Sequence, residues 1–190
     1  MSSSHPYLQT GIETDNARRL LEMAREEGAF IQGDFTLASG KKSNYYFDGK
    51  RLTLTPEGAY RVGREICSLL SGTSVDAVGG VATGAYPMVT AAGLISHIES
   101  KPVPIFIVRE VSKEHGTMRK IEGHLDEGSQ VAIVEDVLTT GGSVLKAIEA
   151  VEELGCRVLK IIALVDRQEG GSLRLKESGY DFCAMMKLVH

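Results

Sequence analysis

Several residue types that mark particular classes of protein are scarce or absent from this sequence. The chain has no tryptophan and only three cysteines, Cys67, Cys156 and Cys183. An odd number of widely spaced cysteines in apolar segments disfavours a disulfide framework or a metal site and predicts buried, reduced thiols. No apolar run approaches the length of a membrane span, and the first residues lack the charged and apolar parts of a secretory signal. We therefore expect a cytoplasmic protein.

The charge balance and two missing motifs exclude several further classes of function. Twenty-one Lys and Arg residues stand against 25 Asp and Glu, and the net charge of −4 argues against a general nucleic-acid or membrane surface. Neither G-x-x-x-x-G-K-[ST] nor G-x-G-x-x-G occurs, which excludes a Walker-type nucleotide site and a dinucleotide fingerprint. With 43% hydrophobic and 24% charged residues, the chain has the composition of one compact domain over residues 1–190.

Hydrophobic periodicity predicts an α/β fold with a parallel sheet and helices on both faces. Strand-like and helical runs alternate in the order strand 75–81, helix 85–98, strand 103–108, strand 131–134, helix 143–155 and strand 158–165. Ahead of them we expect a helix that Asp15 caps and that ends near Gly28, followed by a short hairpin over 35–47. A second helix is predicted from Pro56 to Gly72.

The segment from Val131 to Ser143 carries most of the functional information. Its buried strand leads into Glu135 and Asp136 and then into a turn of Thr, Gly and Ser that opens a helix. Such a turn lies at the carboxyl end of a strand, where its N–H groups, hydroxyls and helix dipole suit an anion. The carboxylates would repel phosphate but can accept hydrogen bonds from ribose hydroxyls, and they should point to opposite faces of the sheet. Seen alone, the turn could equally be an ordinary capped helix start.

These features together resemble the phosphoribosyl pyrophosphate (PRPP) signature of the type I phosphoribosyltransferases. The resemblance implies that family's fold, in which a central, mainly parallel sheet carries helices on both faces and a small N-terminal hood. It also implies that PRPP is bound by Glu135, Asp136, Val137, Leu138, Thr139, Thr140, Gly141, Gly142 and Ser143. In that arrangement Glu135 and Asp136 contact the ribose hydroxyls, while the turn from Thr139 to Ser143 holds the 5-phosphate.

A second glycine-rich turn, Gly79-Gly-Val-Ala-Thr-Gly84, also follows a predicted strand and precedes a helix. By the same resemblance it would bind the pyrophosphate of PRPP through Ala82 and Thr83. The peptide bond between these two residues is then a candidate for a non-proline cis bond. The alternative is that the glycines only allow the helix to pack closely on the strand.

Three further motifs are similar to those of the orotate phosphoribosyltransferases within this family. They are F-T-L-A-S-G-K-K-S-N-Y-Y-F-D at 35–48, R-E-V-S-K-E-H-G at 109–116 and D-R-Q-E-G-G at 166–171. The resemblance implies that Arg167 faces the carboxylate of orotate and that Thr139 contacts both the base and the phosphate loop.

The first of these motifs implies a hood over the base, formed by residues 15–55 after a probable tail of residues 1–14. In the hood, Tyr46 and Phe47 would flank the flat base, although alternate residues of a strand often only fill a core. Ala38 stands where one branch of the family has lysine and another has alanine.

The motif at 109–116 implies a mobile catalytic loop over residues 109–124 that acts in the partner's site of a homodimer. Arg109, Lys113 and His115 would bind PRPP and stabilise the departing pyrophosphate together with Mg²⁺, which PRPP and water would mainly hold. His115 could also donate a proton near neutral pH. Glu110 occupies the position of a family lysine, and a carboxylate cannot neutralise pyrophosphate.

The expected function is transfer of the 5-phosphoribosyl group from PRPP to orotate, a step of pyrimidine biosynthesis that yields orotidine 5′-monophosphate and pyrophosphate. One alternative is a regulator that binds PRPP without turnover, which Glu110 favours, although the chain has little room for a nucleic-acid-binding domain. Another is a phosphoribosyltransferase for a different base, but such an enzyme has no need of an arginine facing a carboxylate.

Overall fold

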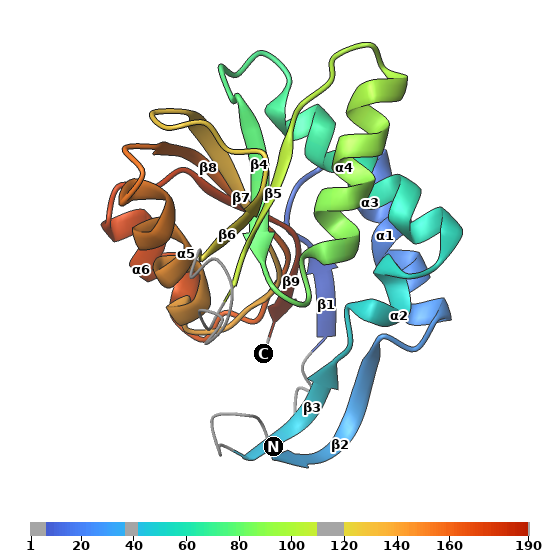
Figure 1. The fold of residues 1–190 in the computed structure, drawn as a ribbon. Helices are drawn as coiled ribbons and strands as arrows, with labels where there is room; N and C mark the ends of the chain where they lie inside the picture. The colour runs from blue at the N-terminus through green and yellow to red at the C-terminus, as the bar shows by residue number, and fades with distance from the viewer. Residues whose placement is uncertain (1–6, 37–41, 110–119, 190) are drawn as a thin grey trace.

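The computed structural model describes residues 7–36, 42–109 and 120–189. Its centre is a seven-stranded sheet in the order β1-β9-β8-β7-β4-β5-β6, and β2 and β3 form a separate hairpin (Figure 1). The strands are β1 (Tyr7–Thr10), β2 (Phe30–Thr36), β3 (Lys42–Phe47), β4 (Ala77–Val81), β5 (Ile105–Val108), β6 (Ile121–Gly123), β7 (Gln130–Leu138), β8 (Arg157–Asp166) and β9 (Phe182–Val189). The five inner strands are parallel, whereas the edge strands β1 and β6 are antiparallel to their neighbours.

Helices cover both faces of the sheet, as the sequence predicts. They are α1 (Asp15–Glu26), α2 (Lys50–Thr53), α3 (Pro56–Leu70), α4 (Tyr86–Ile98), α5 (Gly142–Glu152) and α6 (Gly171–Glu177). In Figure 1, α1, α3 and α4 lie on one side of the sheet, and α5 and α6 lie on the other. The structure therefore has the mainly parallel α/β fold that the motifs indicate.

The alternation of side chains along β7 shows how one strand serves two cores. Ala132 and Val134 pack with residues of α1, α3 and α4, whereas Val131 and Ile133 pack with residues of α5 and α6. All four side chains are fully buried, which explains why this strand reads as a continuous apolar run. The same alternation sends the next two residues, both carboxylates, to opposite faces.

Three details of the N-terminal region differ from the predictions. Thr14, and not Asp15, caps the first helix, because its side-chain oxygen accepts a hydrogen bond from the Ala17 N–H. Residues 1–14 were expected to form a tail, but within the described residues Tyr7–Thr10 forms β1, which pairs with β9 and buries Leu8. The hairpin begins at Phe30, five residues before its predicted start.

The remaining elements agree with the predictions apart from their ends. Strand β7 continues through the two carboxylates to Leu138, four residues beyond its predicted end, because it pairs with β8 along its whole length. The sequence patterns did not predict α2, α6, β6 or β9. Among the described residues, no helix is long and apolar enough to cross a membrane.

Candidate active site at the carboxyl ends of the central strands

Four of the predicted site segments meet at one edge of the sheet. Strands β5, β4, β7 and β8 are neighbours in that order and run parallel. Their carboxyl ends lead to Arg109, to the turn at Ala82, to the turn at Thr139 and to Arg167, respectively. Because ligands of open α/β sheets bind outside the carboxyl ends of the strands, this edge is the candidate active site.

The turn after β7 has the geometry of an anion site. Gly141 adopts a left-handed conformation with φ of 80° and caps α5, which begins at Gly142. The N-terminus of α5 therefore faces the turn, and Ser143 is the second residue of this helix. The Ser143 hydroxyl donates to the Glu135 carboxylate at 3.2 Å, and Glu135 is only 6% exposed. Glu135 thus lies on the α5 side of the sheet.

Asp136 lies on the opposite face, as the strand alternation predicts. One carboxylate oxygen accepts a hydrogen bond from the Val137 N–H at 2.9 Å. The carboxyl group rests against Gly84, at the end of the turn after β4, and its Cβ lies near Gly49. Asp136 is therefore the carboxylate that lies between the two glycine-rich turns.

The carboxyl-terminal end of β4 has little space for side chains. A Cβ on Gly80 would come within 2.4 Å of the Ala85 Cβ and 2.7 Å of the Val134 oxygen. The Ala82–Thr83 peptide bond, which the resemblance made a candidate for a cis bond, is cis. The Ala82 N–H donates to the Val108 oxygen at 2.9 Å, which connects this turn to β5. At Gly80 the glycine is needed for packing, and this agrees with the alternative explanation for that residue.

Backbone hydrogen bonds join the turn after β7 to the turn after β8. The Arg167 N–H donates to the Leu138 oxygen at 2.9 Å, and the Gly171 N–H donates to the Thr139 oxygen at 2.9 Å. A Cβ on Gly171 would lie 2.5 Å from that same oxygen, so only glycine allows this approach. The D-R-Q-E-G-G turn and the predicted phosphate turn thus form one unit.

The Arg167 side chain is buried at 4% exposure between this unit and the hairpin. Its guanidinium carbon lies 4.5 Å from the centre of the Tyr45 ring, a cation–π distance. Nη2 lies 2.9 Å from a carboxylate oxygen of Glu169 and 3.4 Å from the Ser43 hydroxyl. Nε is buried and has no hydrogen-bond partner among the described residues. An open cavity of about 870 Å³ adjoins these groups and the hairpin residues Asp34, Phe35, Lys42 and Asn44.

The three aromatic residues of β3 lie in different environments. Tyr46 is 40% exposed and packs on Phe35, with ring centres 5.6 Å apart, while Phe47 is buried in the core. Tyr45, which the sequence reasoning passed over, is the aromatic residue in contact with Arg167. The alternation Ser43, Tyr45, Phe47 on the inner face of β3 is the signal that could have identified it.

Arg109 follows the carboxyl end of β5, and its side chain forms an ion pair with Glu122 at 2.8 Å. Its backbone N–H donates to the Lys120 oxygen at 2.8 Å, so two residues of the predicted loop, Arg109 and Lys120, lie together. The other predicted loop residues, Lys113 and His115, lie outside the described residues, as does Glu110.

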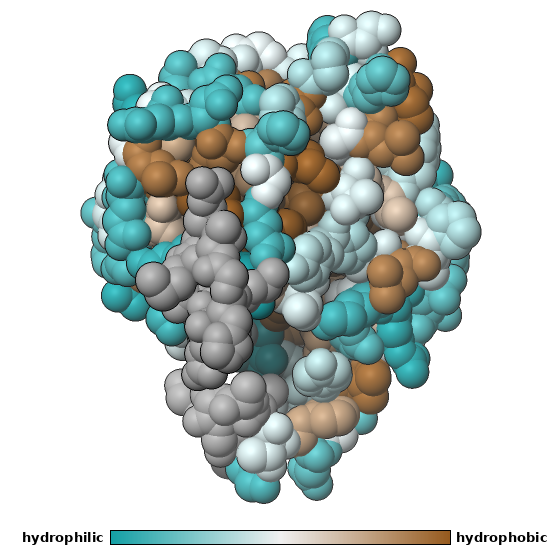
Figure 2. All heavy atoms as spheres, in the orientation of Figure 1, coloured by the Kyte–Doolittle hydropathy of each residue, from teal (hydrophilic) through white to brown (hydrophobic). Residues whose placement is uncertain are grey.

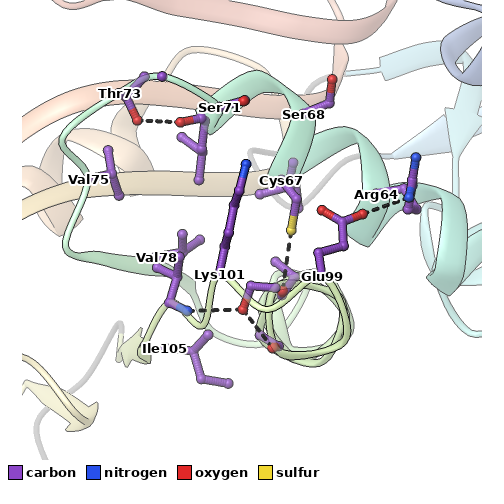
Figure 3. Close-up of a pocket in the computed structure, with 17 residues that line it drawn as sticks. Arg64, Cys67, Ser68, Ser71, Thr73, Val75, Val78, Glu99, Lys101 and Ile105 are labelled. Atoms are coloured by element: carbon purple, nitrogen blue, oxygen red, sulfur yellow. Dashed lines mark hydrogen bonds and ion pairs between the residues drawn. The ribbon is translucent and has the colours of Figure 1, made fainter.

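A second cavity, of about 360 Å³, lies at the opposite edge of the sheet (Figure 3). It is bordered by the C-terminal parts of α3 and α4, and Lys101 extends between Val75 and Cys67. Because β4 and β5 begin at this edge, the cavity is separated from the predicted site residues by the length of the strands. It is therefore not the candidate active site.

Comparison with known proteins identifies the family of this chain. The phosphoribosyl transferase domain family matches residues 56–181. The chain is 42% identical to the orotate phosphoribosyltransferase of Nostoc sp. over 90% of its own length and 83% of that protein's. The chain belongs to the orotate phosphoribosyltransferase family. The counterpart from Methanocaldococcus jannaschii is also 42% identical, over 90% of this chain and 94% of its own.

Solved orotate phosphoribosyltransferase structures have the same fold. The Mycobacterium tuberculosis enzyme in complex with PRPP superposes with a TM-score of 0.73 at 30% identity, over 90% of this chain and 94% of that one. The same enzyme in complex with Fe(III) dicitrate gives a TM-score of 0.77 at 34% identity, over 90% and 95%. These matches confirm the predicted family and the predicted type I fold.

Proposed function

We propose that this chain transfers the 5-phosphoribosyl group of PRPP to orotate, with release of pyrophosphate. The observation that carries the proposal is the buried guanidinium of Arg167 beside a glycine-rich turn at a helix N-terminus. A buried cation suits the carboxylate that orotate has and that uracil, hypoxanthine and adenine lack. The product, orotidine 5′-monophosphate, belongs to pyrimidine biosynthesis.

PRPP would bind across the two turns that follow β4 and β7. The N–H groups and hydroxyls from Thr139 to Ser143 would hold the 5-phosphate, and Ala82 and Thr83 would face the pyrophosphate. Glu135 and Asp136 would accept hydrogen bonds from the ribose hydroxyls. The position of Asp136 against Gly84, between the two turns, supports this assignment.

Orotate would bind in the open cavity between the hairpin and the turn after β8. Arg167 would hold the carboxylate through two parallel N–H···O bonds, and its unpartnered Nε offers one of these donors. Thr139 would bridge the base and the phosphate turn. Tyr46 and Phe47 remain predicted neighbours of the base, although Tyr45 is the ring that the structure places beside Arg167.

The reaction breaks the bond from C1 of the ribose to the pyrophosphate oxygen and forms a bond from C1 to N1 of orotate. Once N1 has lost its proton, orotate is itself the nucleophile, so no covalent intermediate on the protein is needed. Negative charge grows on the departing pyrophosphate, and Arg109, Lys113 and His115 would stabilise it.

Magnesium would reach the site mainly with PRPP and water. Within residues 7–36, 42–109 and 120–189, no group of three or more His, Cys, Asp or Glu side chains could hold a metal ion. Mg²⁺ commonly binds through substrate phosphates, several waters and one or two carboxylates, and Asp136 or Glu135 could supply the latter. Such an ion would offset the charge of the pyrophosphate.

A homodimer in which residues 109–124 act across the interface is also part of the proposal. An apolar surface on α3, α4 and the preceding turn supports it. This surface comprises Leu54, Tyr60, Tyr86, Leu94 and Ile98, all at least 40% exposed. Figure 2 shows apolar surface over α4 at the upper right. Exposed patches of large apolar residues are typical of interfaces.

The test of the proposed function is product formation by the purified chain. With PRPP, Mg²⁺ and orotate, the reaction should yield orotidine 5′-monophosphate and pyrophosphate in equal amounts, and uracil, hypoxanthine and adenine should not react. If PRPP binds but no base is converted, the chain is a PRPP-binding regulator. Conversion of another base would show that the chain is a phosphoribosyltransferase for that base. A cytoplasmic location is a separate prediction, which this assay does not test.

A further inference from the structure

The anion that contacts Arg167 in the structure belongs to the chain itself. A carboxylate oxygen of Glu169 lies 2.9 Å from Nη2. Glu169 follows Arg167 by two residues in the turn after β8, and both residues border the open cavity in which orotate is proposed to bind. A side-chain carboxylate therefore already occupies one donor of the proposed recognition residue.

The guanidinium itself is held in place without Glu169. Tyr45 packs on its face, Ser43 lies near Nη2, and only 5% of the Arg167 side chain is exposed. The Arg167 backbone is fixed by its hydrogen bond to Leu138. Removing the charge of Glu169 should therefore leave the orientation of Arg167 unchanged.

Glu169, by contrast, has room to turn away. Its side chain is 24% exposed, about five times more than that of Arg167. Its backbone is held by a tight turn, because Gln168 and Gly170 on either side have φ of 56° and 96° and the Gln168 N–H donates to Asp166 at 2.8 Å. Any response of Glu169 is thus a rotation of its side chain.

Two carboxylates at one guanidinium repel each other because both are negative, and the single positive charge offsets only one of them. The carboxylate of a base that binds Arg167 through Nε and Nη2 competes directly with Glu169 for Nη2. A base without a carboxylate leaves the pair between Arg167 and Glu169 intact.

We propose that Glu169 is an internal counterion of Arg167 that the carboxylate of orotate or of the product displaces. This inference rests on the proposed function. The pair compensates the buried charge of Arg167, and displacing it weakens the binding of orotate and of orotidine 5′-monophosphate. Glu169 thus sets the affinity for the carboxylate by competing for Arg167, without touching the reacting atoms.

Calorimetric binding of orotidine 5′-monophosphate and of orotate to the full chain tests this inference without turnover. Glu169→Gln keeps an acceptor for Nη2 but removes the competing charge, and the dissociation constant for either ligand should fall about fivefold. The matched control is Glu177→Gln, which changes the net charge equally at an exposed residue of α6. In this control the dissociation constants for orotate and orotidine 5′-monophosphate should equal those of the wild type. In both variants the binding of PRPP should be unchanged.

An unchanged or larger dissociation constant in Glu169→Gln would overturn the inference, since it would make Glu169 either irrelevant or a support for Arg167. A fall of equal size in Glu177→Gln would also overturn it, because the effect would then come from net charge alone. If the wild-type chain converts orotate but Glu169→Gln binds no more tightly, only this inference fails. If the wild-type chain neither binds nor converts orotate, the proposed function fails as well.

Discussion

The carboxylate of Asp136 lies so close to Gly84 that no side chain fits between them. A Cβ added to Gly84 would lie 2.1 Å from both Cγ and Oδ2 of Asp136. No other group lies as near to that position, so the obstacle is the end of one side chain and not the backbone. Glycine at this position therefore leaves Asp136 free to lie between the two proposed phosphate turns.

Gly84→Ala should lower kcat/KM for PRPP at least about tenfold, because Asp136 must move away from its position. The free energy of unfolding should change little, because the displaced group is the end of one side chain and not backbone. Steady-state kinetics and thermal unfolding check both effects. Gly179→Ala is the control: φ at Gly179 is 86° and its surroundings are open, so this change should cost about 1 kcal/mol of stability and leave kinetics unchanged. Equal activity in Gly84→Ala and wild type would rule out the assigned position of Asp136.

Tyr45 should affect orotate more than PRPP, because its ring packs on the guanidinium of Arg167. Tyr45→Leu removes the ring and should raise KM for orotate about fivefold to tenfold, with KM for PRPP nearly constant. Tyr45→Phe keeps the ring face and should stay within about twofold of wild type in KM for orotate. A parallel rise in both KM values would instead indicate general damage to the hairpin.

Tyr45, the aromatic residue beside Arg167, was not predicted from the sequence. The motif identified the hairpin, but the residue that faces the site depends on the pairing register of β2 and β3, in which Gln32 pairs with Tyr45 and Ile31 with Tyr46. A shift of one residue reverses the faces of a strand, and with three adjacent aromatic residues the alternation of Ser43, Tyr45 and Phe47 is only a weak local signal of the register.

Other parts of the fold differ in how far local sequence determines them. The end of β7 and its turn could be predicted because a buried apolar run, two carboxylates and a glycine-rich turn are contiguous. Strand β1 could not be predicted, because its four residues are held by pairing with β9 at the far end of the chain. Likewise, the contact between Asp136 and Gly84 arises from the parallel pairing of β4 with β7.

Leu94→Arg tests the proposed dimer surface. Leu94 is 60% exposed on α4, so a charge there should not disturb the core. If α4 forms the interface, the dimer would bury one arginine from each subunit, so the variant should sediment as a monomer, with unfolding near wild type. Loss of at least about 90% of the activity is expected if residues 109–124 act in the partner's site. A dimer of unchanged stability would contradict the assignment of this surface.

Mixing two inactive variants tests the exchange of loops between subunits. Lys113→Ala should lower turnover about 100-fold or more, because it removes a charge proposed to stabilise the departing pyrophosphate. In a mixed dimer with Arg167→Met, one of the two sites would have both wild-type residues if the loop acts across the interface. Random mixing should then restore about a quarter of wild-type activity. If Lys113 acts in its own subunit, each site lacks one group and no activity returns.

The central claim is that Arg167 selects the base by its carboxylate. The most direct test compares kcat/KM for orotate and for uracil in the wild-type chain and in Arg167→Met, whose apolar side chain can still pack on Tyr45. We predict that the wild type prefers orotate by at least about 100-fold and that Arg167→Met loses about 100-fold for orotate alone, with PRPP binding unchanged. A variant that retains the wild-type preference for orotate would contradict the account.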